Sequence, residues 1–416
     1  MKSLFSGAMH KAAKLTQNQN VIEATRVIRR ALSGGRENSS WPTDTSSEKI
    51  QRIEPKQTPA EVAGFARAGA GIGAEGAARD FGFNPGRVKR PLGEILELLR
   101  TPDLPGFGLP SKPAVKARSA PPVPPDGAGF LTRTFACEAG SRDYKLYVPS
   151  RMKSSKRPLI VMLHGCAQNP DDFAAGTGMN LLAEEHGFIV AYPRQPTSSN
   201  PTACWNWFNI KDQMRDIGEP SILAGITRHI MAEFDIDSKK VFMAGLSAGG
   251  AMTAIMSTAY PELYAAAGIH SGLAYGSATD LPSAFAAMRG NPGLAEKTPK
   301  RRRSGKAGGV RTIVFHGASD QTVHPANADR IVAAARAELS DPELEIEQGQ
   351  AGGRKYTRTI ITEASGVPHV EYWAIQGLGH AWSGGRPEGS YTDHQGPDAT
   401  REMLRFFLKR PTPTPR

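Results

Sequence analysis

Short, fully apolar segments alternate with helix-like segments from about residue 130 onward. The segments 158–165, 188–193 and 239–247 each contain an unbroken apolar run, without the polar alternation of a half-exposed strand. Strands that are apolar on both faces are typical of a parallel sheet covered by helices on both sides. The sequence therefore predicts an α/β protein with a mostly parallel sheet, whose ligands bind beyond the carboxyl ends of the strands.

Periodicity and turn residues place the remaining elements. The predicted strands are 131–139, 142–150, 158–165, 188–193, 239–247, 264–272, 311–320, 354–364 and 370–380, and the predicted helices are 182–187, 221–234, 248–260, 326–339 and 398–408. The first two strands alternate in polarity and predict a hairpin. The segment 276–309 interrupts this rhythm, and it is either a cap over the site or a surface insertion.

Composition divides the chain into an extension at 1–128 and a globular domain at 129–410. Residues 8–33 have apolar side chains at helical spacing with arginines between them, which predicts a basic amphipathic helix. Residues 35–128 are rich in Gly, Pro, Ala and Ser, so we expect them to be mostly disordered, with one short helix at 91–100.

The net charge of +11 is uneven, because residues 1–130 hold 19 Lys and Arg against 12 Asp and Glu. A basic extension could contact nucleic acid, an anionic surface or a polymer granule, but a solvated tail is the commoner interpretation. We therefore predict no nucleic-acid partner for this protein.

Several classes of protein do not fit the sequence. Three cysteines are too few for a disulfide scaffold, and no Cys-x-x-Cys pair indicates a structural zinc site. No apolar run approaches the roughly 20 residues of a membrane span. The first 20 residues lack the continuous apolar core of a secretory signal, so export is not predicted from this sequence.

A serine stands between glycines where a predicted strand meets a predicted helix. Gly245, Ser247 and Gly249 form a Gly-x-Ser-x-Gly pattern with an apolar strand before it and a helix after it. This context is typical of a nucleophile elbow, a sharp turn that presents the hydroxyl above the sheet. The alternative is a purely structural turn. The pattern in this setting favours the nucleophile.

A nucleophilic serine needs a base, and the base needs a carboxylate that orients it. Asp320 and His380 each lie just past the end of a predicted strand, in the chain order Ser247, Asp320, His380. This order is the one expected for an elbow of this kind. The alternatives nearby are His316, His324, His369 and Asp329. Of these, His316 fits packing at its strand end, and His369 precedes its strand on the opposite edge of the sheet.

Acyl transfer also needs N–H donors for the developing oxyanion. Cys166 directly follows the predicted strand 158–165. In α/β proteins with a nucleophile elbow, a loop after such a strand supplies one of these N–H groups. The N–H of Ala248, directly after the nucleophile, is the expected second donor.

The segments that carry these residues resemble the poly(3-hydroxybutyrate) depolymerase-like esterases, a branch of the α/β-hydrolases that also contains feruloyl and acetylxylan esterases. The motifs are LHGCAQNPDDFA, CWNWF, GLSAGGAM, FHGASDQTV and GLGHAWSGG, followed by GSYTDHQGPDATREMLRFF, and they cover about 130–410. The resemblance implies an α/β-hydrolase fold, a Ser247, Asp320 and His380 triad, and Cys166 at the oxyanion site. It does not cover residues 1–128, and the extracellular location common in the family stays undecided.

Aromatic side chains follow two of these motifs. Trp207 and Trp382 could form an apolar wall for an acyl chain, or they could simply pack loops onto the domain. Both interpretations stay open at this stage.

The sequence thus predicts a serine esterase for hydroxyalkanoate polyesters or smaller esters, working through an acyl-enzyme and requiring no cofactor and no metal. The alternatives are the same chemistry on feruloyl or acetyl esters of polysaccharide, and a catalytically idle protein bound to polymer granules by the helix at 8–33.

Two of the cysteines follow neighbouring predicted strands. Cys166 ends one strand, and Cys204 lies in the loop that leaves the strand 188–193, so the two loops can meet at one edge of the sheet. A disulfide there would fix the Cys166 N–H and hold Trp207 near the site, whereas a reducing compartment would favour two buried thiols. We predict the disulfide, with Cys137 free.

Overall fold

The computed structural model describes residues 124–151, 156–291, 309–337, 339–363 and 366–409. The predicted helices at 8–33 and 91–100 lie outside the described residues.

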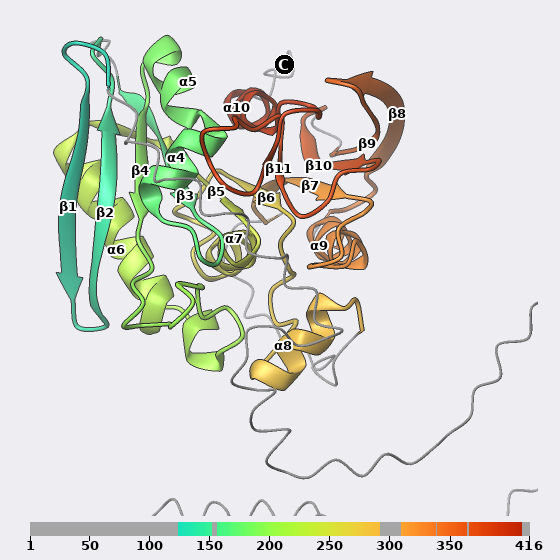
Figure 1. Ribbon diagram of the computed structural model, residues 1–416, viewed down its shortest axis with the longest axis horizontal. Coiled ribbons are helices and arrows are strands. Elements are labelled where there is room, and N and C mark those ends of the chain that lie inside the picture. The colour runs from blue at the N-terminus through green and yellow to red at the C-terminus, as the bar shows by residue number, and fades with distance from the viewer. Residues whose placement is uncertain (1–123, 152–155, 292–308, 338, 364–365, 410–416) are drawn as a thin grey trace, which may run out of the picture. The chain divides into compact units, whose positions relative to one another are not determined.

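One ten-stranded sheet forms the centre of the described region, in the order β1-β2-β4-β3-β5-β6-β7-β10-β9-β8 (Figure 1). The strands are β1 (Gly129–Cys137), β2 (Gly140–Val148), β3 (Arg157–Leu163), β4 (Ile189–Pro193), β5 (Ile236–Leu246), β6 (Ala266–His270), β7 (Arg311–Gly317), β8 (Glu343–Ala351), β9 (Arg354–Thr362) and β10 (Pro368–Ile375). The six strands from β4 to β10 in this order are parallel, and the flanking pairs are antiparallel. This is the predicted α/β-hydrolase architecture.

Helices cover both faces of the sheet. They are α4 (Pro170–Thr177), α5 (Met179–His186), α6 (Gly218–Glu233), α7 (Ala248–Ala259), α8 (Leu281–Met288), α9 (Ala326–Arg336) and α10 (Ala399–Leu408), with a short 3₁₀ helix η1 (Ile210–Gln213) and two short strands β11 (Trp382–Ser383) and β12 (Thr392–Asp393). In the described ranges, none of the helices has both the length and the apolar character needed to cross a bilayer.

The alternation of side chains along β3 shows why its sequence is apolar throughout. Leu159, Val161 and Leu163 belong to a core with α6 and α7, whereas Ile160 and Met162 belong to a second core with α4, α5 and α10. Successive side chains of a strand point to opposite faces, so each face of β3 meets a layer of helices. The two cores clamp the central strands and fix the positions of their ends.

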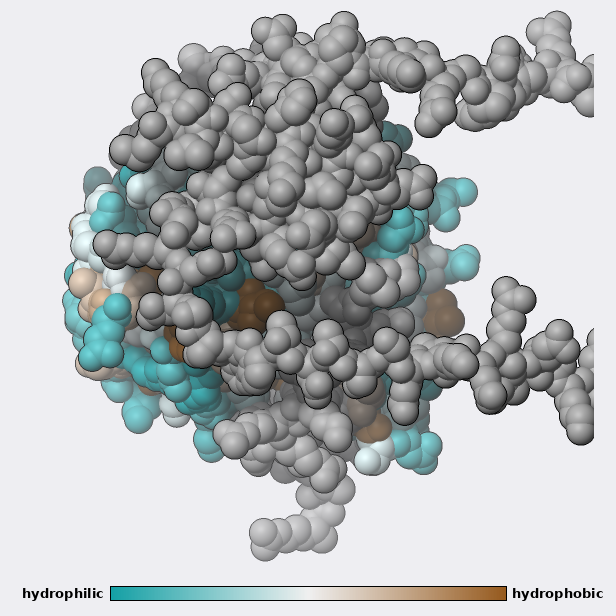
Figure 2. Space-filling model, turned by 90° about the horizontal axis from the view of Figure 1, so that it is seen from below, coloured by the Kyte–Doolittle hydropathy of each residue, from teal (hydrophilic) through white to brown (hydrophobic). Residues whose placement is uncertain are grey.

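The carboxyl ends of the parallel strands share one edge of the sheet, here called the site edge. β1 points toward the bottom of Figure 1, and the pairings through β2 and β4 give β3, β5 and β7 the same direction. Figure 2 views the molecule from this side, and its coloured part mixes apolar with polar side chains. Within the segment 276–309, the described part holds α8, whose Ala284 is buried against the α6 and α7 core.

Candidate active site

Ser247 occupies the turn between β5 and α7 with a strained backbone. Its φ of 56° and ψ of −118° lie in a backbone region that residues other than glycine rarely adopt. The Ser247 N–H donates to the carbonyl of His270 on the neighbouring strand at 2.9 Å, which secures the turn. Its side chain is half-buried at the site edge. A non-glycine residue held in this way is typical of a nucleophile elbow.

The two glycines of the elbow are required by close packing. A Cβ on Gly245 would overlap the backbone carbonyl of Gly249, and a Cβ on Gly249 would overlap the carbonyl oxygen of Leu163. Helix α7 therefore begins directly against the ends of β5 and β3. This contact presents Ser247 beside the loop that follows β3.

Asp320 and His380 are brought together at the same edge. His380 Nδ1 lies 2.8 Å from Asp320 Oδ2, and the Asp320 side chain is fully buried. The second oxygen, Asp320 Oδ1, accepts the N–H groups of Thr322 and Val323, both at 2.9 Å. These bonds fix the carboxylate, which in turn orients the imidazole ring.

Backbone hydrogen bonds join the two loops that carry this pair. Ala318 N–H donates to the carbonyl of Ile375 at 2.8 Å, and Ser319 N–H donates to the carbonyl of Leu378 at 3.0 Å. A Cβ on Gly317 would overlap the Leu378 carbonyl, so the loops after β7 and β10 pack backbone against backbone. The positions of the acid and the histidine therefore depend on each other.

The pKa of Asp320 is lowered from its ordinary value. Burial by itself raises the pKa of this carboxyl, but the hydrogen bond and charge of His380, together with the Val323 N–H, outweigh burial. Asp320 is thus kept ionised, the state that holds Nδ1 of His380 protonated and leaves Nε2 free to take a proton.

The hydrogen bonds between described residues include the one from His380 to Asp320 and none between His380 and Ser247. The carboxylate and the base are therefore assembled, while the contact between base and nucleophile is not formed. Such contacts often tighten only when substrate binds. The complete triad stays a prediction.

The loop that follows β3, residues 164–168, is here called the oxyanion loop. The Gly165 carbonyl lies 2.8 Å from His164 Nδ1 and accepts the Gln168 N–H at 3.3 Å. A peptide group is planar and trans, so the Cys166 N–H points away from these partners. Among the described hydrogen bonds, none uses the Cys166 N–H. A Cβ on Gly165 would lie 3.6 Å from Ser247 Cβ, so this free donor lies near the nucleophile.

The Ala248 N–H is the first of helix α7, where the helix dipole favours negative charge. Like the Cys166 N–H, the Ala248 N–H donates no hydrogen bond to any other described residue. The two predicted oxyanion donors therefore flank Ser247 with their N–H groups unused. Their role stays a prediction.

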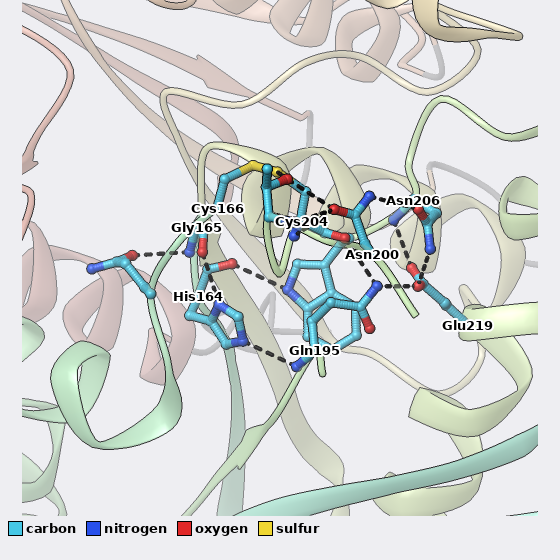
Figure 3. Close-up of a disulfide and its surroundings, with 11 residues drawn as sticks. His164, Gly165, Cys166, Gln195, Asn200, Cys204, Asn206 and Glu219 are labelled. Carbon is cyan, nitrogen blue, oxygen red and sulfur yellow. Dashed lines mark hydrogen bonds between the residues drawn. A yellow bond between two sulfur atoms is a disulfide. The ribbon is translucent and has the colours of Figure 1, made fainter. Parts of the chain in front are cut away.

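The predicted disulfide between Cys166 and Cys204 is present, with the two Cα atoms 4.2 Å apart (Figure 3). Cys137 is free and exposed, also as predicted. The disulfide ties the oxyanion loop to the segment 195–208, here called the disulfide loop. Trp205 of this loop is buried and donates from Nε1 to the carbonyl of His164 at 3.1 Å.

The two predicted wall tryptophans have different surroundings. Trp207 is 6% exposed and packs at an edge against Phe208 in the disulfide loop. Trp382 is 1% exposed, stacks on His270 and donates from Nε1 to Thr400 at 2.9 Å. Both side chains are buried, Trp207 in the core with α6 and α7 and Trp382 in the core with α4, α5 and α10, and a wall role stays a prediction for each.

The four alternative residues from the sequence have different surroundings. His324 and Asp329 are exposed, and His369 lies at the start of β10, at the opposite end of the sheet. His316 is buried and its Nε2 lies 2.8 Å from the carbonyl of Val323 and 3.5 Å from Asp320 Oδ2. Burial lowers the pKa of His316, against the opposing effects of the Val323 carbonyl and the Asp320 charge.

Sequence reasoning missed the residues that support the site. Gln168 accepts the Gly165 N–H at 2.9 Å through Oε1 and donates from Nε2 to Asp172 and to Ser390. His270 accepts the Ser383 N–H at 2.9 Å, which holds the segment after His380. The contacts of Gln168 with Ser390 and of His270 with Ser383 join residues far apart in the chain, so no local pattern could have indicated them.

Comparison with known proteins places these observations in a family. Residues 142–338 match a family model described as esterase PHB depolymerase. The chain is 33% identical to poly(3-hydroxyalkanoate) depolymerase C of Paucimonas lemoignei, over 59% of this chain and 60% of that protein. It is 28% identical to feruloyl esterase B of Neurospora crassa, over 63% of this chain and 86% of that protein.

Two further relatives are acetylxylan esterases. Acetylxylan esterase A of Talaromyces purpureogenus is 29% identical over 48% of this chain and 55% of that protein. The solved acetyl xylan esterase from Aspergillus awamori shares the fold, with a TM-score of 0.51, 22% identity and coverage of 67% of this chain and 98% of that one. The matches to the depolymerase and to the Talaromyces esterase thus span 60% and 55% of those proteins.

The α/β-hydrolase sheet, the elbow at its centre and these matches agree with one another. Residues 142–338 of this chain are similar to the esterase PHB depolymerase family, and the described fold is that of an α/β-hydrolase.

Proposed function

We propose that this chain is a serine esterase that hydrolyses hydroxyalkanoate esters through Ser247, His380 and Asp320. The observation that carries the proposal is the 2.8 Å contact of His380 Nδ1 with the buried Asp320 carboxylate, at the same sheet edge as the strained Ser247 turn. A nucleophile, a base and an orienting acid, here after β5, β10 and β7 at one edge of the sheet, are the requirements for acyl transfer.

The reaction follows from the positions of these atoms. Ser247 Oγ attacks the ester carbonyl, and its proton passes to Nε2 of His380, the ring nitrogen that faces away from Asp320. The negatively charged oxygen of the tetrahedral intermediate accepts hydrogen bonds from the N–H groups of Cys166 and Ala248, which are otherwise unused. His380 then returns the proton to the departing alkoxide, and Ser247 carries the acyl group.

Deacylation repeats these steps with water. His380 takes a proton from water, the hydroxide attacks the acyl carbonyl, and the released Ser247 oxygen receives the proton back. The ionised Asp320 stabilises the imidazolium in both halves of the reaction. The chemistry needs no cofactor.

The proposed substrate is a short-chain hydroxyalkanoate ester, as polymer or oligomer. The proposal is supported by the match to a protein named for poly(3-hydroxyalkanoate) depolymerisation. Trp207, which follows Cys204 by three residues in the disulfide loop, would line the acyl side of the site. A feruloyl or acetyl ester of polysaccharide is the second candidate, supported by the matches to proteins with those names.

A substrate panel separates the two candidates. Purified protein would be incubated with hydroxybutyrate trimer, methyl ferulate and acetylated xylan, with Ser247→Ala as the control for contaminating esterases. We expect kcat/KM to be highest for the trimer. A higher value for methyl ferulate or acetylated xylan would assign the second candidate, and no hydrolysis of any ester would overturn the proposed function.

A granule-bound, catalytically idle protein is a candidate of another class. Its predicted binding helix at 8–33 lies outside the described residues, and the assembled Asp320 and His380 pair argues against idleness. Sedimentation with hydroxybutyrate granules, for the full chain and for a chain lacking residues 1–40, would test granule binding separately from hydrolysis.

A further inference from the structure

A buried carboxylate that takes no part in the proposed chemistry lies behind the oxyanion loop. Glu219, the second residue of α6, is 2% exposed, and its side chain points into the disulfide loop (Figure 3). We propose that Glu219 is a positioning residue, which holds the oxyanion loop in its reactive conformation through Gln195 and the disulfide loop. The inference rests on the proposed function, in which the Cys166 N–H binds the oxyanion.

Glu219 binds three N–H donors of the disulfide loop. Its Oε2 accepts the backbone N–H of Asn206 at 2.8 Å, and its Oε1 accepts the Asn206 side-chain amide at 2.7 Å. Oε1 also accepts Nε2 of Gln195. These contacts clamp the disulfide loop on both sides of Cys204.

Gln195 connects this clamp to the oxyanion loop. Its Nε2 also donates to the carbonyl of Cys204 at 2.9 Å, next to the disulfide. Its backbone N–H lies 3.1 Å from Nε2 of His164. A backbone N–H can only donate, so His164 Nε2 is the acceptor and the proton is on Nδ1.

His164 in turn holds the peptide group that joins Gly165 to Cys166 and contains the proposed oxyanion donor. Burial lowers the pKa of His164 to about 4, so the ring is neutral at pH 7. Its Nδ1 proton then donates to the Gly165 carbonyl at 2.8 Å. That carbonyl and the Cys166 N–H belong to one rigid peptide unit, so fixing the carbonyl fixes the direction of the N–H. The second connection is the disulfide itself, which joins Cys204 to Cys166.

The donors around the side chain match a carboxylate better than an amide. Both oxygens of a carboxylate accept hydrogen bonds, whereas a glutamine amide would place an NH₂ group against at least one of the N–H donors. Arg142 Nη2 lies 3.5 Å from Glu219 Oε1, and Arg142 Nε donates to Gln195 Oε1 at 3.1 Å, which turns the Gln195 amide toward Glu219. Burial and the nearby Asp212 raise the pKa of Glu219 to about 7, against the opposing effects of Asn206, Gln195 and Arg142.

The test compares Glu219→Gln with the wild type in the full chain. We expect kcat for p-nitrophenyl butyrate to fall about 10- to 100-fold, somewhat less than the 10²- to 10³-fold that loss of an oxyanion donor costs. KM should stay within about threefold, because ground-state binding uses this donor little. The Ki of a trifluoromethyl ketone, whose adduct with serine carries an oxyanion, should rise by the same factor as kcat/KM falls.

Two further variants separate positioning from stability. Glu371→Gln changes an equally buried carboxylate in β10, away from the oxyanion loop, and it should lower the melting temperature with little change in kcat. Asn206→Ser removes one donor to Glu219 from a half-buried position, so it tests the same connection if Glu219→Gln does not fold. We expect it to lower kcat by a smaller factor, with the same parallel rise in Ki.

The outcomes distinguish this inference from the proposed function. If the wild type hydrolyses esters and the folded variants at Glu219 and Asn206 keep kcat and Ki within twofold, Glu219 has a merely structural role and the inference is overturned. An inactive wild type would overturn the proposed function, and this inference with it.

Discussion

Two buried carboxylates on neighbouring strands, Asp320 after β7 and Glu371 in β10, have different partners. Asp320 lies past the carboxyl end of its strand and faces the imidazoles of His380 and His316. Glu371 is fully buried and binds two guanidinium groups, Arg358 Nη2 at 3.0 Å and Arg405 Nη2 at 2.5 Å.

The chemistry of the partners separates the two sites. A guanidinium group keeps its charge at any pH of interest, so the cluster around Glu371 is a fixed ion network that joins β9, β10 and α10. An imidazole can accept and release a proton during a reaction, so the carboxylate that orients it can support proton transfer. We therefore expect changes at the site edge to reduce rate more than stability, and changes at the Glu371 cluster to reduce stability more than rate.

The largest expected effect is at the nucleophile. Ser247→Ala should lower kcat by about 10⁴- to 10⁶-fold, because the acyl-enzyme cannot form. The free energy of unfolding should change by less than about 1 kcal/mol, since only one hydroxyl is removed. Initial rates with p-nitrophenyl butyrate and urea unfolding would measure the two quantities. Residual activity above a tenth of the wild type would assign the nucleophile elsewhere.

The acid is expected to have the next largest effect. Asp320→Asn should lower kcat by about 10³- to 10⁴-fold, because an amide next to His380 favours the wrong tautomer of the ring. Asp329→Asn is the matched control, since Asp329 is exposed on α9, and it should leave kcat unchanged. Equal kcat values for the wild type and Asp320→Asn would show that Asp320, like Glu371, is not needed for the rate of the reaction.

The ion cluster should show the opposite behaviour. Glu371→Ala leaves two guanidinium groups without their buried carboxylate, which should lower the free energy of unfolding by about 3–5 kcal/mol. The kcat per folded molecule should stay within about twofold of the wild type. Chemical unfolding and active-site titration on the same sample would show both. A tenfold loss of kcat in folded protein would mean that this cluster also controls the site.

The disulfide is expected to affect both quantities. Cys204→Ser opens a link across 38 residues, which should lower the free energy of unfolding by about 2–4 kcal/mol. It should also lower kcat about tenfold, because the oxyanion donor is held less firmly. Cys137→Ser is the control, since this thiol is free and exposed, and it should change neither. Unchanged kcat in Cys204→Ser would show that the disulfide only stabilises.

The smallest expected effect is on stability in acid. The pKa of Asp320 is lowered on folding, so the stability from its ionised form is present above the ordinary carboxyl value of 3.8. This contribution is lost as the pH falls through the lowered pKa of the folded state. The stability difference between the wild type and Asp320→Asn should therefore shrink between pH 5 and pH 2 in urea unfolding. A difference that widens in acid would contradict the direction of this shift.

Most of the central sheet could be predicted from the sequence, because its strands are apolar on both faces. β8 could not, since none of the nine positions of ELEIEQGQA is buried, so its sequence lacks the apolar pattern of a core strand. Helix α4 was also missed, although the Asn169 cap and the Pro170 at its start are ordinary helix signals.

The candidate site divides in the same way. Ser247, Asp320 and His380 lie at strand ends, where position along the chain indicates position in space. Glu219 sits in the first turn of α6, where an acidic residue is expected merely to favour the helix dipole. Only the fold shows that this carboxylate meets Gln195 and Asn206, so its role has no signature in the sequence.

Active-site labelling tests the central claim most directly. The wild type would be treated with a fluorophosphonate and digested, and the modified peptide would be identified by mass spectrometry, with Ser247→Ala and Asp320→Asn alongside. The account predicts one modified residue, Ser247, no labelling of Ser247→Ala, and slowed labelling of Asp320→Asn. Labelling at another serine, or equal rates of labelling in wild type and Asp320→Asn, would contradict it.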